Sequence, residues 1–192
     1  MKPKQFDPDK AIEIIADSFA RNGFEGTSLN TIIKETGLGK QSLYNAFGDK
    51  KAMATKSIQC FGKLSNASQI LNNPRLNGKE RIEDFFQEIL KDSQKTNYVG
   101  CLMTNLLLEK GNTDQDVQKA TNERLTMTKK NLQDVVEIGV TDGSINIPEG
   151  LDSELISLSL MNLLNGLRVT IQTKTEIDKI KKMVKISLKS LI

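Results

Sequence analysis

The sequence predicts an all-α protein in which a small N-terminal bundle of three helices precedes a larger helical domain. Apolar residues recur at intervals of three and four along most of the chain, which is the spacing of one face of an α-helix. No segment alternates convincingly between apolar and polar residues, as a half-buried strand would. With 192 residues, 38% of them hydrophobic and 27% charged, the chain can build a hydrophobic core without disulfide or metal staples.

The first helix is expected to begin after Asp7 and to end near Gly23. Asp7 is a favourable N-cap, and Pro8 suits the first turn because a helix leaves that backbone N–H unpaired. Apolar side chains three and four positions apart form a stripe that should face a core: Ile12, Ile15, Ala16, Phe19 and Ala20.

Residues 27–53 predict two short helices joined by a tight turn, followed by the start of a longer helix. Thr27 or Ser28 can cap the first short helix, and Gly37 gives the backbone the freedom that the turn needs. The second short helix covers roughly residues 40–47. The longer helix that follows is expected to be capped by Asp49 and to continue to about Leu71.

The outer face of this helix pair suits a nucleic acid. Four apolar side chains can pack the pair against the first helix: Ile32, Ile33, Leu43 and Phe47. The side chains left outside are a lysine, two amides, a hydroxyl and a phenol: Lys40, Gln41, Ser42, Tyr44 and Asn45. Such groups bind phosphates and base edges. The pattern alone is equally compatible with an ordinary glycine-joined helix pair and solvated lysines.

The positive charge of the chain is concentrated in the same region. From Lys34 to Lys56 there are five lysines and two acids, an excess of three that equals the formal net charge of the whole chain, +3. A local basic patch is a better indication of a polyanionic partner than the net charge is.

An ordered run of motifs covers this region: Phe19-Ala20-Arg21-Asn22-Gly23-Phe24, Gly26-Thr27-Ser28, Ile32, Gly37-Leu38-Gly39-Lys40, Leu43-Tyr44-Asn45-Ala46-Phe47 and Asp49-Lys50. The run resembles the DNA-binding domain of the TetR (tetracycline-repressor-like) family. The resemblance implies a three-helix DNA-binding domain with a helix-turn-helix, in which the helix near Lys40 enters the major groove. It also implies a two-fold dimer on a palindromic operator. Gly39 departs from the Ser or Thr that is more frequent there, although glycine is a tolerable N-cap.

Carried over by position, the resemblance implies eight DNA-contacting residues. Thr27 and Ser28 would contact phosphate and cap the second helix. Lys40 and Tyr44 would bind the DNA backbone or a base edge, and Lys50 would meet phosphate. The candidates for contacting bases are Gln41, Ser42 and Asn45.

The C-terminal part predicts a homodimer. Residues 155–171 are apolar on nearly every side, so they must be covered on every side. The chain's own core can cover one side, and a second subunit is the natural cover for the other. The final helix, with a stripe over residues 177–191, would complete an antiparallel four-helix interface across a two-fold axis. The alternative is a helix buried wholly within one chain.

The resemblance also implies a pocket for a small-molecule effector, which we expect to be apolar or weakly polar. The candidate walls are Phe85, Phe86, Ile89, Cys101, Leu102, Met103, Leu106, Met127 and Met161. Ordinary core packing is the competing interpretation for each of them. The methionines are the better candidates because their side chains adapt to irregular cavities.

Two alternative functions stay open. Cys101 lies near the start of a short helix, where the helix dipole favours a thiolate, so the chain could sense electrophiles or oxidants. A buried and inert thiol is the competing interpretation. The other alternative is a helical interaction adaptor without DNA binding.

Several classes of function are not expected. The chain has no histidine, no G-x-S-x-G, no P-loop and no C-x-x-C pair, so we expect no enzyme, no metal site and no cofactor. Residues 155–167, the longest relevant uncharged stretch, are too few and too polar to span a bilayer. Together with an N-terminus that lacks an apolar signal region, this predicts a cytoplasmic protein without a membrane partner.

The predicted domains are residues 1–50, which would bind DNA through the helix-turn-helix, and residues 51–192, which would bind the effector and dimerise.

Overall fold

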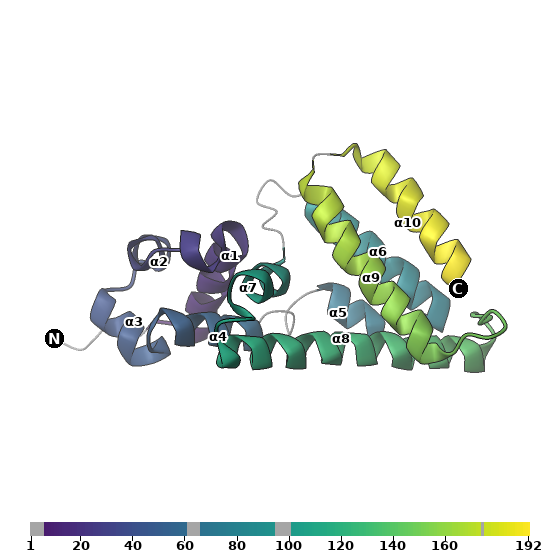
Figure 1. Ribbon diagram of the computed structural model, residues 1–192, viewed down its shortest axis with the longest axis horizontal. Coiled ribbons are helices and arrows are strands. Elements are labelled where there is room, and N and C mark those ends of the chain that lie inside the picture. The colour runs from purple at the N-terminus through teal and green to yellow at the C-terminus, as the bar shows by residue number, and fades with distance from the viewer. Residues whose placement is uncertain (1–5, 61–65, 95–100, 174) are drawn as a thin grey trace. The chain divides into compact units, whose positions relative to one another are not determined.

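The computed structural model describes residues 6–60, 66–94, 101–173 and 175–192. Every regular element in those ranges is an α-helix (Figure 1), so the predicted all-α class is confirmed. The chain divides into two compact units. Unit 1 comprises residues 1–63 and 101–124, and unit 2 comprises residues 64–100 and 125–192. A domain division between residues 50 and 51 stays a prediction.

Each helix of the described ranges, except α8, lies within a single unit. Those of unit 1 are α1 (Pro8–Gly26), α2 (Leu29–Thr36), α3 (Lys40–Phe47), α4 (Lys50–Cys60) and α7 (Leu102–Lys110). Those of unit 2 are α5 (Asn66–Leu71), α6 (Gly78–Ser93), α9 (Ser153–Gln172) and α10 (Ile177–Leu191). Helix α8 (Gln115–Asp142) begins in unit 1 and ends in unit 2.

Helix boundaries follow local capping chemistry. The Asp7 carboxylate accepts hydrogen bonds from the backbone N–H groups of Asp9 (3.0 Å) and Lys10 (3.3 Å), which confirms the predicted start of α1. The backbone leaves helical geometry at Gly23 (φ 71°, ψ −177°), where the end of the first helix was expected. The predicted helix from Asp49 to Leu71 is present as α4 and α5, and the residues between them, 61–65, lie outside the described part of the chain.

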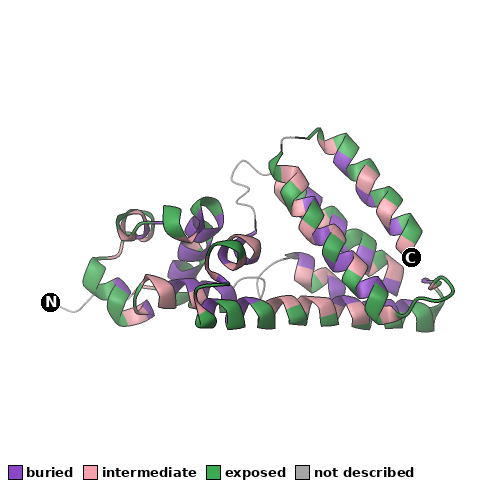
Figure 2. Cartoon of the chain, viewed as in Figure 1, coloured by how far each residue is buried: buried purple, intermediate pink, exposed green. Residues whose placement is uncertain are grey.

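Unit 1 is built around α1, which packs against α2, α4 and α7. Its largest fully buried side chains come from five different helices: Ile15, Phe19, Ile32, Leu43, Met53, Ile58, Leu102 and Leu106. Figure 2 shows the buried faces of α1 and α7 turned inward. This core holds the pair α2 and α3 against α1, as the apolar spacing predicted.

Unit 2 has its own core between α6, the second half of α8, α9 and α10, with α5 packed on α6. One face of α9 is buried, including Ile156, Leu160 and Leu164. Along another face Leu155, Leu158 and Val169 are exposed in the single chain. Among the helices of the described ranges, none combines the length and the apolar character that crossing a membrane requires.

Candidate nucleic-acid interface

The turn between α2 and α3 takes its shape from Gly37. This residue adopts the left-handed conformation (φ 69°, ψ 9°), which residues with a side chain rarely adopt. Its N–H donates to the Ile33 carbonyl at 2.9 Å and closes α2. The Thr36 hydroxyl donates to the Ile32 carbonyl (2.7 Å) and accepts from the Leu38 N–H (3.3 Å). The predicted helix-turn-helix is therefore present.

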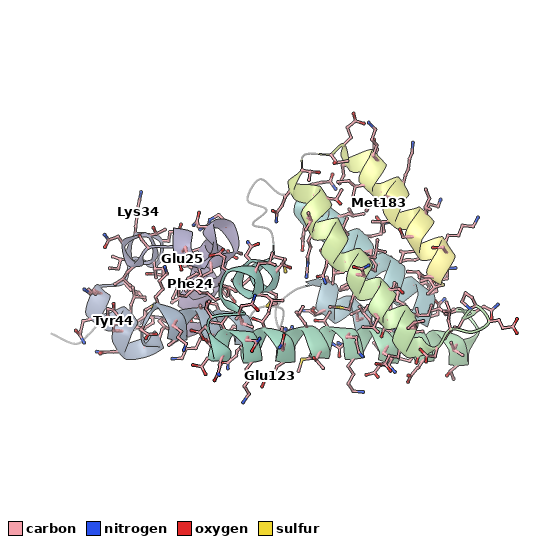
Figure 3. The ribbon with its side chains drawn as sticks, in the orientation of Figure 1. Phe24, Glu25, Lys34, Tyr44, Glu123 and Met183 are labelled. Atoms are coloured by element: carbon pink, nitrogen blue, oxygen red, sulfur yellow. The ribbon has the colours of Figure 1, made fainter. Side chains whose placement is uncertain are left out.

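Helix α3 has one buried side and one polar side. Leu43 and Phe47 are buried in unit 1. The predicted outward row is exposed: Lys40, Gln41, Ser42, Tyr44 and Asn45. Figure 3 shows Tyr44 at the surface of this helix. Their exposure agrees with the sequence analysis, and their contacts with DNA stay a prediction.

The exposed side of α3 is partly organised in the absence of DNA. The Gln41 Nε2 donates to Asn45 Oδ1 at 2.9 Å, so the two amides are held side by side. The Lys40 Nζ lies 5.9 Å from the centroid of the Tyr44 ring. Gly39 caps α3 without a side-chain hydrogen bond, which leaves the first N–H groups of the helix open to an outside acceptor such as a phosphate.

The two residues at the start of α2 have different environments. The Ser28 hydroxyl is exposed and accepts the Thr31 N–H at 3.0 Å, so Ser28 is the N-cap. Thr27 is fully buried, and its hydroxyl faces the carbonyls of Gly23 (2.7 Å) and Ser18 (3.1 Å). The predicted phosphate contact of Thr27 is wrong for this structure, because its only hydroxyl hydrogen is used inside unit 1.

The lysines of the basic segment are not equivalent. The Lys50 Nζ lies 4.4 Å from the centroid of the Phe24 ring on α1. Lys51, by contrast, forms ion pairs with Asp114 (3.1 Å) and Asp116 (2.8 Å). The Lys56 ammonium donates to the Ala46 carbonyl at 3.0 Å. The basic segment therefore contains fewer available charges than the sequence count indicated.

The contacts that connect α7 to the end of α1 were not predicted from the sequence. The Glu109 carboxylate accepts the backbone N–H of Glu25 at 2.9 Å. Lys110 forms an ion pair with Glu25, and this hydrogen bond and charge lower the pKa of the Glu25 carboxyl below its ordinary value. The partners are more than eighty residues apart in the chain, so no local pattern signals the contact.

The predicted effector-pocket residues are divided between the units. Cys101, Leu102, Met103 and Leu106 are buried in unit 1, whereas Phe85, Phe86, Ile89 and Met161 are buried in the core of unit 2. Met127 is 54% exposed in the single chain, and its assignment as a pocket wall stays a prediction. None of these residues lines the α4–α8 groove of about 630 Å³ or the α6–α10 groove of about 670 Å³.

The thiols and acids show no metal-binding arrangement in the part of the chain that is described. Cys101 is the N-cap residue of α7 and is 2% exposed. Cys60 is half-buried at the end of α4, and both cysteines are free. In the described ranges, no three side chains of the His, Cys, Asp and Glu types come together as a metal site would require.

Comparison with known proteins agrees with this geometry. Residues 12–55 match the model of the family described as bacterial regulatory proteins, tetR family. The chain is 26% identical to the HTH-type transcriptional regulator YezE of Bacillus subtilis, over 98% of this chain and 97% of that protein. It is 30% identical to the negative transcriptional regulator of the biofilm operon icaADBC, IcaR of Staphylococcus aureus, over 45% of this chain and 47% of IcaR.

The fold is also that of a solved DNA complex. A cysteine mutant of the TetR family regulator CifR, in complex with 26-bp double-strand operator DNA, superposes with a TM-score of 0.82 over 100% of both chains. The two sequences are 21% identical, so this likeness shows the fold. The polar side of α3 thus belongs to a three-helix arrangement that other proteins use in transcription regulation.

Proposed function

We propose that this chain, a DNA-binding transcriptional regulator that belongs to the tetR family of bacterial regulatory proteins, is a homodimeric repressor released from a palindromic operator by a small-molecule effector. The observation that carries the proposal is the exposed polar side of α3, which a buried apolar side fixes on unit 1. Such a regulator would act in the cytoplasm, where bacterial DNA lies.

The proposed roles of these side chains on DNA follow from their chemistry. Gln41 and Asn45 are amides, which can pair with an adenine edge in the major groove, and Ser42 can bond to either kind of edge. Lys40, Lys50, Tyr44 and Ser28 would meet the DNA backbone, where charge and hydroxyl groups set position without carrying sequence information. The hydrogen bond between Gln41 and Asn45 supports a shared role, since it holds both amides on one side of α3.

The proposed dimer rests on α9 and α10. Leu155, Leu158 and Val169 of α9 and Ile186 of α10 are exposed large apolar side chains of unit 2. Leu155 and Leu158 are three residues apart, which places them on the same side of the helix. A second copy of the same surface would cover these groups, as in an isologous two-fold interface.

Repression and release by an effector are supported by analogy. The relative IcaR is named as a negative regulator, and blocking a promoter is the simplest consequence of binding an operator. An effector that binds better to a second conformation would shift the dimer away from the DNA-bound form. The buried residues Met103 and Met161 stay proposed pocket walls.

The test measures binding of the protein to a labelled duplex taken from the DNA upstream of its own gene. Binding is monitored by fluorescence anisotropy at several salt concentrations. We expect Lys40→Ala to weaken binding to all sequences and to reduce the slope of log affinity against log salt by about 1. Gln41→Ala should instead reduce the preference for the operator over a scrambled duplex. If the wild type binds no duplex at low salt, or if both variants bind as the wild type does, the proposal is wrong.

A further inference from the structure

The first turn of α4 is fixed by two carboxylates from the start of α8. The Lys51 Nζ lies 2.8 Å from Asp116 Oδ2 and 3.1 Å from Asp114 Oδ2. The hydrogen bonds that Lys51 donates to Asp116 and to Asp114 raise the pKa of Lys51 above its ordinary value. The ammonium therefore stays charged and paired throughout the neutral range.

Asp114 uses its two oxygens for two different helices. Its Oδ1 accepts the N–H groups of Asp116 (3.0 Å) and Val117 (3.1 Å) and caps α8, while its Oδ2 faces Lys51. Burial opposes ionisation of Asp114, but the Val117 N–H and Lys51 together lower its pKa below the ordinary value. Lys51 is thus bound to a carboxylate that the helix start already holds in place.

The chain just before Asp114 binds a second part of the three-helix domain. Glu109 accepts the N–H of Glu25, and Lys110 pairs with Glu25 and lies 4.8 Å from the centroid of the Phe24 ring. A Cβ at Gly23 would lie 1.8 Å from a Glu109 oxygen, so this close contact depends on glycine. Figure 3 shows Phe24 and Glu25 side by side at the end of α1. Residues 109–116 therefore contact both α1 and α4.

The position of α4 is passed on to α3 over a short path. Only Gly48 and Asp49 separate the two helices. The Lys56 ammonium of α4 donates to the Ala46 carbonyl at the end of α3 (3.0 Å) and lies 5.8 Å from the centroid of the Phe47 ring. A change in the orientation of α4 would therefore change the orientation of the helix proposed to enter the major groove.

We propose that Lys51, Asp114 and Asp116 form a latch that holds α4, and through it α3, in the orientation that binds DNA. Lys51 is then a positioning residue and not a phosphate contact, although it follows Lys50 directly in the basic segment. This inference rests on the proposed function, because it assigns the residues that set the DNA affinity of that same surface.

The variant Asp114→Asn/Asp116→Asn separates the latch from simple electrostatics. Removing two negative charges and freeing a lysine would strengthen binding to a polyanion if charge alone mattered. The latch predicts the opposite sign, with operator affinity weaker by about two- to fivefold, the range in which partly exposed ion pairs act. Asparagine still caps helices, so α8 keeps its start.

Glu123→Gln is the matched control. Glu123 lies on α8 and lines the same groove as Lys51, but it makes no ion pair with that lysine. We expect Glu123→Gln to bind the operator as tightly as the wild type or slightly more tightly. Thermal unfolding of each variant shows whether the fold is kept, so that a loss of affinity reports on orientation.

Variants of Lys51 give a second readout that a phosphate contact would move. Lys51→Met should weaken binding as the double variant does but leave the slope of log affinity against log salt unchanged, whereas losing a phosphate contact lowers that slope by about 1. Lys51→Arg should restore most of the affinity because the ion pairs can re-form.

Affinity of the double variant equal to or above that of the wild type would overturn the latch. A lower salt slope for Lys51→Met would do the same. A wild type that binds no duplex would overturn the proposed function instead, so the two failures are distinguishable.

Discussion

Gly78 allows α6 and α8 to meet more closely than any larger residue would permit. An added Cβ would lie 2.3 Å from both the N and the Cα of Gly139 and 2.8 Å from the Val135 carbonyl oxygen. These are backbone atoms, so no side chain can rotate away. Ordinary contact begins at 3.4 Å, and Gly78→Ala therefore requires the helices to separate by about 1 Å.

That separation would also loosen the start of α6. The Gly78 N–H donates to Asp142 (2.9 Å) and the Lys79 N–H donates to the Ser144 hydroxyl (3.1 Å). Over-packing costs typically about 1–3 kcal/mol, whereas alanine gains at most about 1 kcal/mol over glycine in helix propensity. With weakened caps added, we expect the free energy of unfolding to fall by about 2 kcal/mol. The midpoint of thermal unfolding should drop by roughly 4–8 °C for a chain of this size.

The assay is thermal and urea unfolding followed by circular dichroism, at one protein concentration because dimerisation would add to the apparent stability. Glu83→Ala on the exposed side of the same helix is the control and should change the stability by no more than about 0.5 kcal/mol. If Gly78→Ala unfolds at the wild-type temperature or above, the close approach of α6 to Gly139 is not a feature of the folded protein.

The remaining predictions concern the Asp142 carboxylate, the exposed face of α9 and the Cys101 thiol. Hydrogen bonds from Ser144 and the Gly78 N–H lower the pKa of Asp142 below its ordinary value. The ionised carboxylate therefore stabilises the fold at a pH above the ordinary Asp pKa, and this stabilisation is lost as the pH falls through the lowered pKa. Asp142→Asn should be less stable than the wild type at pH 7, and the difference in stability should shrink in urea titrations toward pH 3. Leu158→Arg should convert the proposed dimer into a monomer in analytical ultracentrifugation with little change in the helical signal, and an unchanged dimer mass would remove α9 from the interface. Because Cys101 is buried, diamide should leave operator binding nearly unchanged at short times; rapid release from the wild type but not from Cys101→Ser would instead support the thiol sensor.

Local chemistry made much of unit 1 predictable. Asp7, Ser28 and Asp49 are good N-caps, and each of their side chains accepts a backbone N–H at the start of a helix. The Asp49 carboxylate, for example, accepts the Ala52 N–H at 2.8 Å. The apolar spacing placed Leu43 and Phe47 inside. These features depend on residues within one helical turn, where the sequence carries the full information.

Contacts that only the fold brings together explain what the sequence could not show. Thr27 follows a glycine and looks like a surface cap, but the carbonyls of Ser18 and Gly23 lie close enough to take its hydroxyl. Lys50 and Lys51 are identical in type and adjacent, yet only the fold brings Asp114 and Asp116 to one of them. Spacing within α4 gives no hint of that choice.

The predicted pocket shows a different limit. Phe85, Phe86 and Met103 were predicted as inward-facing pocket walls, and all three are buried. Apolar spacing predicts which side chains face inward. It does not tell a side chain that lines a cavity from one that fills a core, because both face inward with the same spacing. The buried side chains of α6 include Ile82, Phe85, Phe86, Ile89 and Leu90.

The most direct measurement of the central claim is base-analogue interference on the footprinted operator. Replacing purines with 7-deaza analogues removes major-groove acceptors, and replacing guanine with inosine removes the minor-groove amino group. If α3 lies in the major groove, 7-deaza substitution within each half-site should weaken binding of the wild type, more than it weakens Gln41→Ala, while inosine should have little effect. Loss of binding with inosine alone, or equal affinity for all the duplexes, would contradict the account.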